Sequence, residues 1–357
     1  MTRVCWPAMA NPTPASASDR TTGRAGEPVA RHRPPVANQG PGTLRVSAVV
    51  EGKSEEWEGT TAVAKLPELL RRSDTSVCVD LSGPSDDQVK QVGAVLALHP
   101  LIVEDIHEGN QRAKIELTDG VVHIVMFSLA YTDEVVITEI DLVLGLGFLM
   151  TAHDRSWDPR ASHHMRSGVG PMLKQGPDHL LWAISDDVVD SYFPFADRLG
   201  DAIDEVQDEV VLTASPDALQ RLFRLKRELI EVRRHVGPVR EVFNQLTNRE
   251  TPLIDPEEVV YFRDVYDHII RLTDELDNYR ELTAATLDVY LTQVNNNLSV
   301  IMKRLTGVTV ILAGIGAVGG LFGMSEANNL GGFWVVTGAT VAAATGLAVF
   351  LRRIDWI

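Results

Sequence analysis

The sequence predicts an α/β domain, then long helices, then two helices that span a membrane. Three observations lead to this fold class. Before residue 177, short apolar runs of β type alternate with a helical pattern. Between residues 178 and 304, apolar residues recur at helical spacing. The last fifth of the chain holds two apolar runs without a charged residue, Leu305–Phe322 and Phe333–Leu351.

The first segment, residues 1–43, is expected to be a disordered tail. It holds seven of the 18 prolines and shows no periodic apolar pattern. It also lacks the apolar core of a signal peptide, so we expect the membrane hairpin to be the first targeting signal.

Residues 44–177 are expected to form the α/β domain, with a mixed sheet. One helix is predicted over 86–97, where Asp86 and Asp87 precede apolar residues that share one face. Residues 159–177 are predicted to be a polar connection. The predicted strands are 45–50, 76–81, 121–129, 135–144 and 147–153.

Residues 178–304 are expected to be helical. The pattern predicts helices over 178–212 and 215–248, the second interrupted near Gly237 and Pro238. No proline follows Pro256, and one apolar register continues from Glu257 to Phe322. A single helix of that length would be on the order of 100 Å long, and it needs neighbours along its sides, which indicates an oligomer.

The carboxyl end predicts a two-span hairpin, because each apolar run is about as long as the roughly 20 residues that cross a bilayer. Basic pairs at 303–304 and 352–353 fall on one side, and that side is expected to be the cytoplasm. We therefore expect a multi-pass protein of the plasma (inner) membrane with cytoplasmic termini. The expected segments are spans 305–322 and 333–351, an external loop 323–332 and a cytoplasmic tail 352–357.

Composition narrows the function classes. The formal net charge is −16, and the acidic residues lie in the part outside the membrane, which argues against a nucleic-acid partner. Cys5 and Cys78 have neither a disulfide framework nor metal-ligand spacing. No phosphate-binding glycine loop and no nucleophile–base arrangement stand out, so we expect no organic cofactor and no enzyme.

The first span carries a stripe of small residues at three- and four-residue spacing. Such a stripe fits close packing of helices without conduction, and it also fits the face of a pore in an oligomer. From the residues alone, packing is favoured. The stripe comprises Met302, Leu305, Thr309, Ala313, Gly316, Gly320 and Gly323.

Several motifs, in one collinear order over residues 76–325, resemble the CorA-type divalent-cation channels. The motifs are Leu98-His99-Pro100-Leu101, Glu104-Asp105, Gln111-Arg112, Lys114-Ile115-Glu116, Tyr261 to His268, Asp288 to Leu291, and Met302 to Thr306. The resemblance implies a homopentameric funnel whose first span lines a central Mg²⁺ pore. The glycine stripe is then the pore face.

At the outer mouth the sequence departs from this family. The family has Gly-Met-Asn, whereas this chain has Gly323-Met324-Ser325, and Glu326 is the only acid in the outer loop. Serine hydroxyls lie further from the axis than asparagine carbonyls, although they can still bind the water shell of Mg²⁺.

Deeper in the pore, Ala313 replaces a hydrophobic gate residue, which leaves Met302 and Leu305 as the expected constriction. Ser299 replaces an asparagine near the inner mouth.

The resemblance also implies a regulatory metal site between neighbouring protomers. The matching carboxylates are Asp105 and Asp264, with Glu104 beside the first and Asp288 as a further acidic ring. The alternative for Asp264 is a solvated charge on a helix. We expect His99 in packing or a turn, and His163–His164 to be solvated.

The sequence thus predicts a passive channel for Mg²⁺ and Co²⁺, gated by intracellular Mg²⁺. The partners expected are copies of the same chain, the lipid bilayer and divalent metal ions. Two alternatives stay open: a transporter of Zn²⁺ or another transition metal, and a non-conducting homologue that senses metal.

Overall fold

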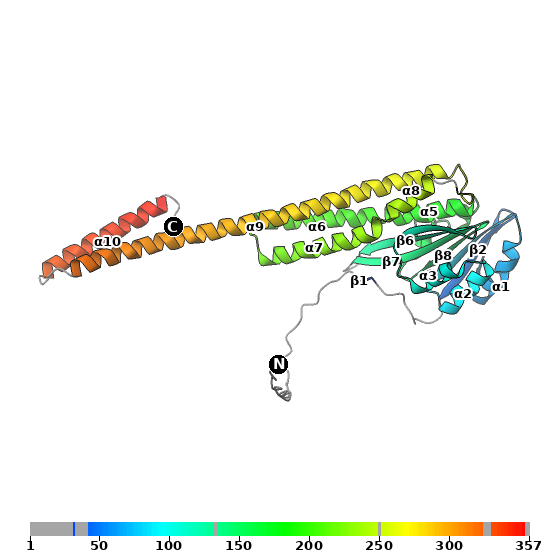
Figure 1. Cartoon of the computed structure of the whole chain (residues 1–357), viewed down its shortest axis with the longest axis horizontal. Helices are drawn as coiled ribbons and strands as arrows, with labels where there is room; N and C mark the ends of the chain where they lie inside the picture. Colours follow the sequence, from blue (N-terminus) through cyan, green and yellow to red (C-terminus); the bar gives the residue numbers. More distant parts are fainter. Residues whose placement is uncertain (1–30, 33–41, 132–134, 249–250, 324–329, 354–357) are drawn as a thin grey trace, which may run out of the picture.

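The computed structural model describes residues 31–32, 42–131, 135–248, 251–323 and 330–353. Figure 1 shows a body of sheet and helices at one end of a single long helix, and a second helix lying beside the other end of that long helix. Of the expected tail, Arg31–His32 form strand β1 and Thr43 begins strand β2. Most of residues 1–43 lie outside the described part.

One sheet runs through the body in the order β3-β2-β4-β8-β7-β6-β5, and β1 pairs with β7. The β4–β8 and β1–β7 pairs are parallel, and the others are antiparallel. The strands are β2 Thr43–Val50, β3 Lys53–Glu58, β4 Thr75–Ser82, β5 Lys114–Thr118, β6 Val121–Tyr131, β7 Val135–Gly145 and β8 Phe148–His153.

All five predicted strands are confirmed, and β1, β3 and β5 were missed. Strands β3 and β5 lie at the two ends of the sheet; β3 is almost entirely exposed, and β5 is partly exposed. Edge strands that face water carry polar residues, so the sequence Lys-Ser-Glu-Glu-Trp-Glu of β3 has no apolar alternation to detect.

Three helices pack on one face of the sheet, α1 Gly59–Leu70, α2 Asp86–Val95 and α3 Pro100–Glu108. Helix α2 confirms the prediction over 86–97 and begins with a capping box between Ser85 and Gln88. Helix α3 was not predicted. His99 is its N-cap, and its Nδ1 accepts a hydrogen bond from the backbone N–H of Leu101.

The other face is covered by helices of the carboxyl-terminal half, α5 Pro177–Asp190, α6 Tyr192–Leu212, α7 Pro216–Val236 and α8 Val239–Asn248, together with the first part of α9 Val259–Gly323. The predicted helix over 178–212 is two helices that break at Ser191. Just after the break, the Tyr192 hydroxyl donates to the carbonyl of Phe127 in the sheet. The predicted interruption near Gly237 is confirmed. The connection 159–177 contains a 3₁₀ turn, Pro159–Ala161, and α4 Gly170–Leu173.

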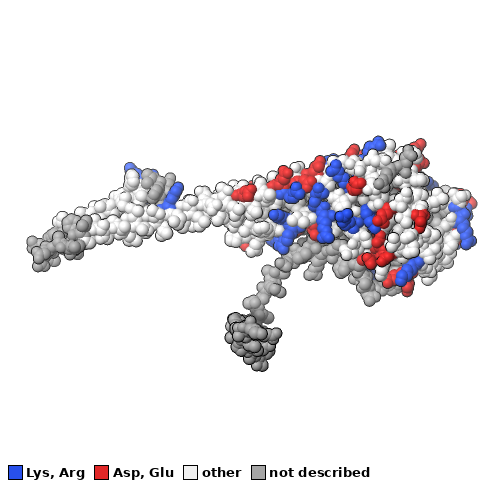
Figure 2. Space-filling view, viewed as in Figure 1, with Lys and Arg blue, Asp and Glu red and all other residues white. Residues whose placement is uncertain are grey.

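Helix α9 confirms the prediction of one helix into the apolar region, since it is 65 residues long. It is the one helix, among the residues that could be searched, that is long and apolar enough to cross a membrane. Helix α10, Leu330–Arg353, runs back beside it. In Figure 2 charged side chains are scattered over the body, whereas the described side chains of the far part of α9 and α10 are white apart from a few Lys and Arg side chains.

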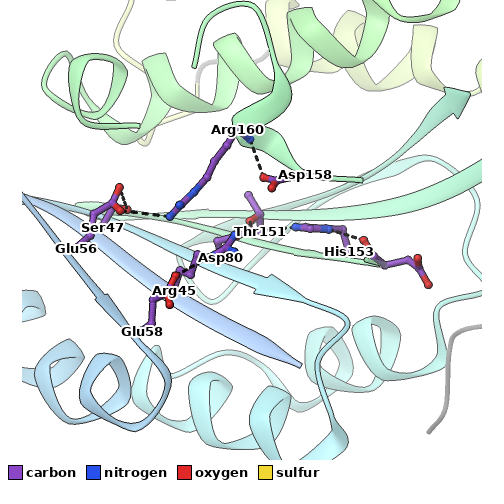
Figure 3. A network of polar contacts seen from close by, with 10 residues as sticks. Arg45, Ser47, Glu56, Glu58, Asp80, Thr151, His153, Asp158 and Arg160 are labelled. Atoms are coloured by element: carbon purple, nitrogen blue, oxygen red, sulfur yellow. Dashed lines mark hydrogen bonds and ion pairs between the residues drawn. The ribbon is translucent and has the colours of Figure 1, made fainter. Parts of the chain in front are cut away.

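A polar network joins the parallel strands β4 and β8 in the middle of the sheet (Figure 3). Asp80 is 6% exposed, and its Oδ1 accepts from Thr151 Oγ1 at 2.7 Å and lies 2.9 Å from His153 Nε2. Burial opposes ionisation of Asp80, but its bonds to His153 and Thr151 prevail and lower its pKa. The network joins the central strands of the sheet, and none of Asp80, Thr151 and His153 is among the candidate cation ligands.

Candidate cation sites on α3, α5 and α9

The small-residue stripe lies on the far part of α9, outside the body. Met302 and Leu305 are 59% and 58% exposed, and Ala313 is exposed. A Cβ placed on Gly316 or Gly320 would meet no atom within 4 Å. The glycines therefore leave room along one side of α9 that a single chain does not fill.

The two ends of the predicted pore differ in what the structure describes. Gly323 is the last residue of α9, and Met324, Ser325 and Glu326 lie outside the described residues. At the inner end, Ser299 is exposed and its Oγ donates to the carbonyl of Asn295. The hydroxyl acts as the donor in that bond, so its lone pairs stay open to water.

Asp105 on α3 has both carboxylate oxygens engaged inside its own chain. Its Oδ1 accepts from Gln111 Nε2 at 3.1 Å, and its Oδ2 accepts from Lys114 Nζ at 2.6 Å. Lys114 also donates to Glu116 Oε2 at 3.2 Å. Burial favours the neutral amine, but the hydrogen bonds to the two carboxylates prevail and raise the pKa of Lys114, so it is charged at neutral pH.

Acidic groups continue behind Asp105 along the sheet. Ligand atoms of Asp105, Glu116 and His123 lie within 4.8 Å of one another. His123 is fully buried and bonds through Nε2 to Asp141 Oδ1 at 2.8 Å. Burial, and then the negative charge of Asp141, raise the pKa of Glu139 to about 8. This region of the body is therefore rich in carboxyl groups that a cation can stabilise.

A second cluster forms where α5 meets α9. Ligand atoms of Asp186, Asp190 and His268 lie within 4.8 Å of one another. His268 Nδ1 is 3.4 Å from Asp190 Oδ1, and its Nε2 is 3.8 Å from Asp264 Oδ2. Burial, and then the neighbouring charge of Asp186, raise the pKa of Asp190. The Asp264 side chain, 70% exposed, stands at the open edge of this cluster.

His164 also belongs to this region, which corrects the expectation that it is solvated, whereas His163 is exposed as expected. The His164 Nε2 is 2.9 Å from Asp186 Oδ2, and the His164 ring packs against Trp182. The cluster thus offers imidazole nitrogens as well as carboxylate oxygens, a donor set that suits Zn²⁺ or Co²⁺ as well as Mg²⁺.

Asp105 and Asp264 do not meet within one chain. The residues beside Asp105, Ile102 and Ile106, belong to the core on one face of the sheet, whereas Phe262 and Val265 beside Asp264 belong to the core on the other face. Two such carboxylates can share an ion only across neighbouring chains. Glu104 on α3 and Asp288 on α9 are exposed and lie apart from both clusters.

Sequence reasoning missed Asp186, Asp190 and His268. A signal was present, because Asp186/Asp190 and Asp264/His268 are both spaced i, i+4, which places each pair on one helix face. What the sequence does not contain is the packing of α5 against α9 that brings the two pairs together.

A comparison with solved structures identifies the fold of this chain. The structure of the CorA magnesium transporter from Methanocaldococcus jannaschii superposes with a TM-score of 0.74 at 20% identity, over 88% of this chain and 98% of that one. The chain therefore has the fold of that structure.

The sequence comparisons identify the family. The model of the family "CorA-like Mg2+ transporter protein" matches residues 73–353. The cobalt/magnesium transport protein CorA of Thermotoga maritima is 31% identical over 314 residues, which cover 85% of this chain and 89% of that protein. The zinc transport protein ZntB of Yersinia pseudotuberculosis is 25% identical over 202 residues, or 54% of this chain and 59% of that protein.

The chain belongs to the CorA-like Mg²⁺ transporter family, whose members transport divalent metal ions and are not enzymes.

Proposed function

We propose that this chain is a passive channel for Mg²⁺, and for Co²⁺, formed by five copies in the plasma membrane with both termini in the cytoplasm. The ion is expected to pass along the small-residue stripe of α9, between a constriction at Met302 and Leu305 and an outer mouth at Ser325. The second span is expected at 333–351, within α10. The flow needs no nucleotide, because only the electrochemical gradient drives it.

The observation that carries this proposal is the far part of α9. It is apolar, yet 6% of its most apolar window is buried in the single chain. Lipid can cover one side of such a helix. The glycines leave a side on which backbone carbonyls come close to the surface, and copies arranged about an axis would turn that side to a hydrated ion.

We propose further that cytoplasmic Mg²⁺ holds the channel closed by binding between Asp105 of one protomer and Asp264 of its neighbour. Asp264 is largely exposed and so can meet another chain, and hard carboxylate oxygens that share an ion with water fit Mg²⁺. When intracellular Mg²⁺ falls, neighbouring protomers lose the ion that joins their carboxylates, and the ring loosens. The bound ion can bias the gate only because it binds the closed state more tightly.

The test of conduction is Mg²⁺ entry into proteoliposomes that contain the purified protein, with Co²⁺ and Zn²⁺ in parallel and Ser325→Asn as the matched variant. We expect Mg²⁺ entry by the unmodified protein and faster entry by the variant, because amide carbonyls are stronger dipoles than hydroxyls. No flux from either protein would refute the channel, and flux only from the variant would indicate a non-conducting metal sensor.

The test of gating is the double variant Asp105→Ala plus Asp264→Ala in the same assay. Internal Mg²⁺ is expected to suppress entry through the unmodified protein and to lose that effect in the variant. Gating by internal Mg²⁺ that survives both substitutions would contradict the sensor.

One observation favours a second candidate, transport of Zn²⁺ or a related transition metal. The cluster beside Asp264 includes imidazole groups of His268 and His164, which Mg²⁺ does not require and Zn²⁺ prefers. Zinc entry that exceeds Mg²⁺ entry in the parallel assay would select this candidate.

A further inference from the structure

Asp105 is already paired with a cation that belongs to its own chain. The Lys114 ammonium lies 2.6 Å from Asp105 Oδ2, and both side chains are about four-fifths buried, at 23% and 21% exposure. A carboxylate has roughly four acceptor positions, so the oxygens have room for a water or an ion. The adjacent positive charge nevertheless opposes the approach of any second cation.

Lys114 has a second carboxylate within reach. Its Nζ is 3.2 Å from Glu116 Oε2, and Lys114 and Glu116 are two residues apart on β5, so their side chains share one face of the strand. Glu116 is more exposed than Asp105, at 47% against 21%. The ammonium can therefore leave Asp105 and keep an ionic partner.

We propose that Lys114 is a tethered cation that competes with Mg²⁺ for Asp105 and sets the Mg²⁺ concentration at which the cytoplasmic sensor responds. As Mg²⁺ binds, Lys114 turns toward Glu116 and Asp105 becomes a ligand. When Mg²⁺ leaves, the ammonium returns and keeps Asp105 neutralised. This inference rests on the proposed role of Asp105 in the sensor, and it adds the residue that tunes that role.

The competition has a calculable size. A unit charge about 5 Å from a divalent ion changes its binding by roughly tenfold when the surroundings screen as water does, and by more in a partly buried site. Removing the ammonium with Lys114→Gln is therefore expected to lower the half-saturating Mg²⁺ concentration about tenfold. Glu116→Gln is expected to raise it about threefold, because the displaced ammonium then has no acceptor.

The experiment is a Mg²⁺ titration of the purified full-length protein in detergent at constant ionic strength. The readout is the thermal unfolding temperature, from which the half-saturating Mg²⁺ concentration is obtained. Lys53→Gln is the control, since Lys53 is an exposed lysine on β3 and its loss changes the net charge equally. The control is expected to stay within twofold of the unmodified protein.

Direct attraction of Mg²⁺ by Glu116 would also raise the half-saturating concentration in Glu116→Gln, and the double variant Lys114→Gln plus Glu116→Gln separates such an effect from competition. If Glu116 acts by receiving the lysine, its substitution has no effect once Lys114 is gone. An equal effect of Glu116→Gln in both backgrounds would overturn the exchange, and so would an unchanged or raised half-saturating concentration in Lys114→Gln.

Asp105→Ala distinguishes the failure of this inference from the failure of the sensor. If Asp105→Ala leaves the Mg²⁺ response unchanged, Asp105 is not in the sensor and the proposed gating is wrong. If Asp105→Ala weakens the response while Lys114→Gln behaves like Lys53→Gln, the sensor stands and the competition is refuted.

Discussion

The two halves of α9 have similar helical geometry and opposite surroundings. In the body, Phe262, Val265 and Ile269 are fully buried against the helices α5 to α8. Further along, Leu305 and Leu312 are 58% and 63% exposed in the single chain. The first half is stabilised by its own chain, whereas the second half has an apolar surface that only lipid or other copies can cover. One helix thus joins a part stable in water to a part that needs a membrane.

The largest expected effect on the comparison of the two halves of α9 comes from a substitution of Phe262. Phe262→Ala removes a fully buried ring and leaves a cavity, so we expect the body to lose about 3–5 kcal/mol of its free energy of unfolding. Chemical denaturation of the full-length protein in detergent measures the loss. Leu305→Ala is the matched control on the same helix, and a comparable loss from that variant would contradict the division of α9 into two halves.

A charge placed in the second half of α9 tests whether that half spans the membrane. Leu312→Arg places a guanidinium near the middle of the predicted span, which costs about 2.5–3.5 kcal/mol of insertion free energy. We expect less protein in the membrane fraction and little metal entry into proteoliposomes. Leu146→Arg is the control, because Leu146 is 89% exposed at a turn of the body. Normal membrane insertion of the Leu312 variant would argue against the span.

A buried charge is tolerated in the body only because partners surround it. Asp80→Ala leaves His153 and Thr151 without their shared acceptor, and we expect a loss of about 2–3 kcal/mol in stability. The pKa of Asp80 is lowered in the folded state, so its contribution is present at neutral pH and is lost as the pH falls toward and below its usual value. Unfolding curves at pH 7 and at a pH well below 3.8 should therefore differ less for the variant than for the unmodified protein.

The pKa of Glu139 is shifted in the opposite direction to that of Asp80, and its substitution has the smallest expected effect on stability. Its pKa is raised from 4.5 to about 8, so the folded state holds a proton that the unfolded chain releases. Stability is therefore lost as the pH rises from about 5 through 8. Between pH 6 and pH 9, the stability of Glu139→Gln relative to the unmodified protein is expected to rise by about 2 kcal/mol. Each pH unit between the unfolded and the folded pKa changes the free energy of unfolding by about 1.4 kcal/mol, and solvent screening reduces this change. A constant difference across this range would show that Glu139 is ionised throughout.

Much of the fold was predictable because its signals are local. Five strands with apolar runs, the capped helix α2 and the uninterrupted helix α9 follow from neighbouring residues. The misses have physical reasons. The exposed strand β3 carries no apolar alternation, and β5 alternates over only five residues. Helix α3 is a short helix behind a His-Pro pair, and the break at Ser191 interrupts a periodicity that continues across it.

Asp105 and Asp264 were proposed as site residues from the sequence because each matches a family motif, and their role stays a prediction. Their partners were not predicted. The lysine beside Asp105 stands in the same motif, but its distance from the carboxylate depends on how β5 lies against α3. The histidine and carboxylate cluster at Asp186, Asp190 and His268 depends on the packing of α5 on α9.

The sequence by itself determined the two apolar runs, the length of α9 and the family, because hydropathy, helical period and motif order are properties of the chain. Only the tertiary structure decided which charges are neighbours. It put Asp105 against Lys114 on one face of the sheet, and the Asp264–His268 pair of α9 beside Asp190 of α5 on the other face. Electrostatic interactions fall off with distance in space and not along the chain, so the charge state and competitors of each candidate ligand emerge only after folding.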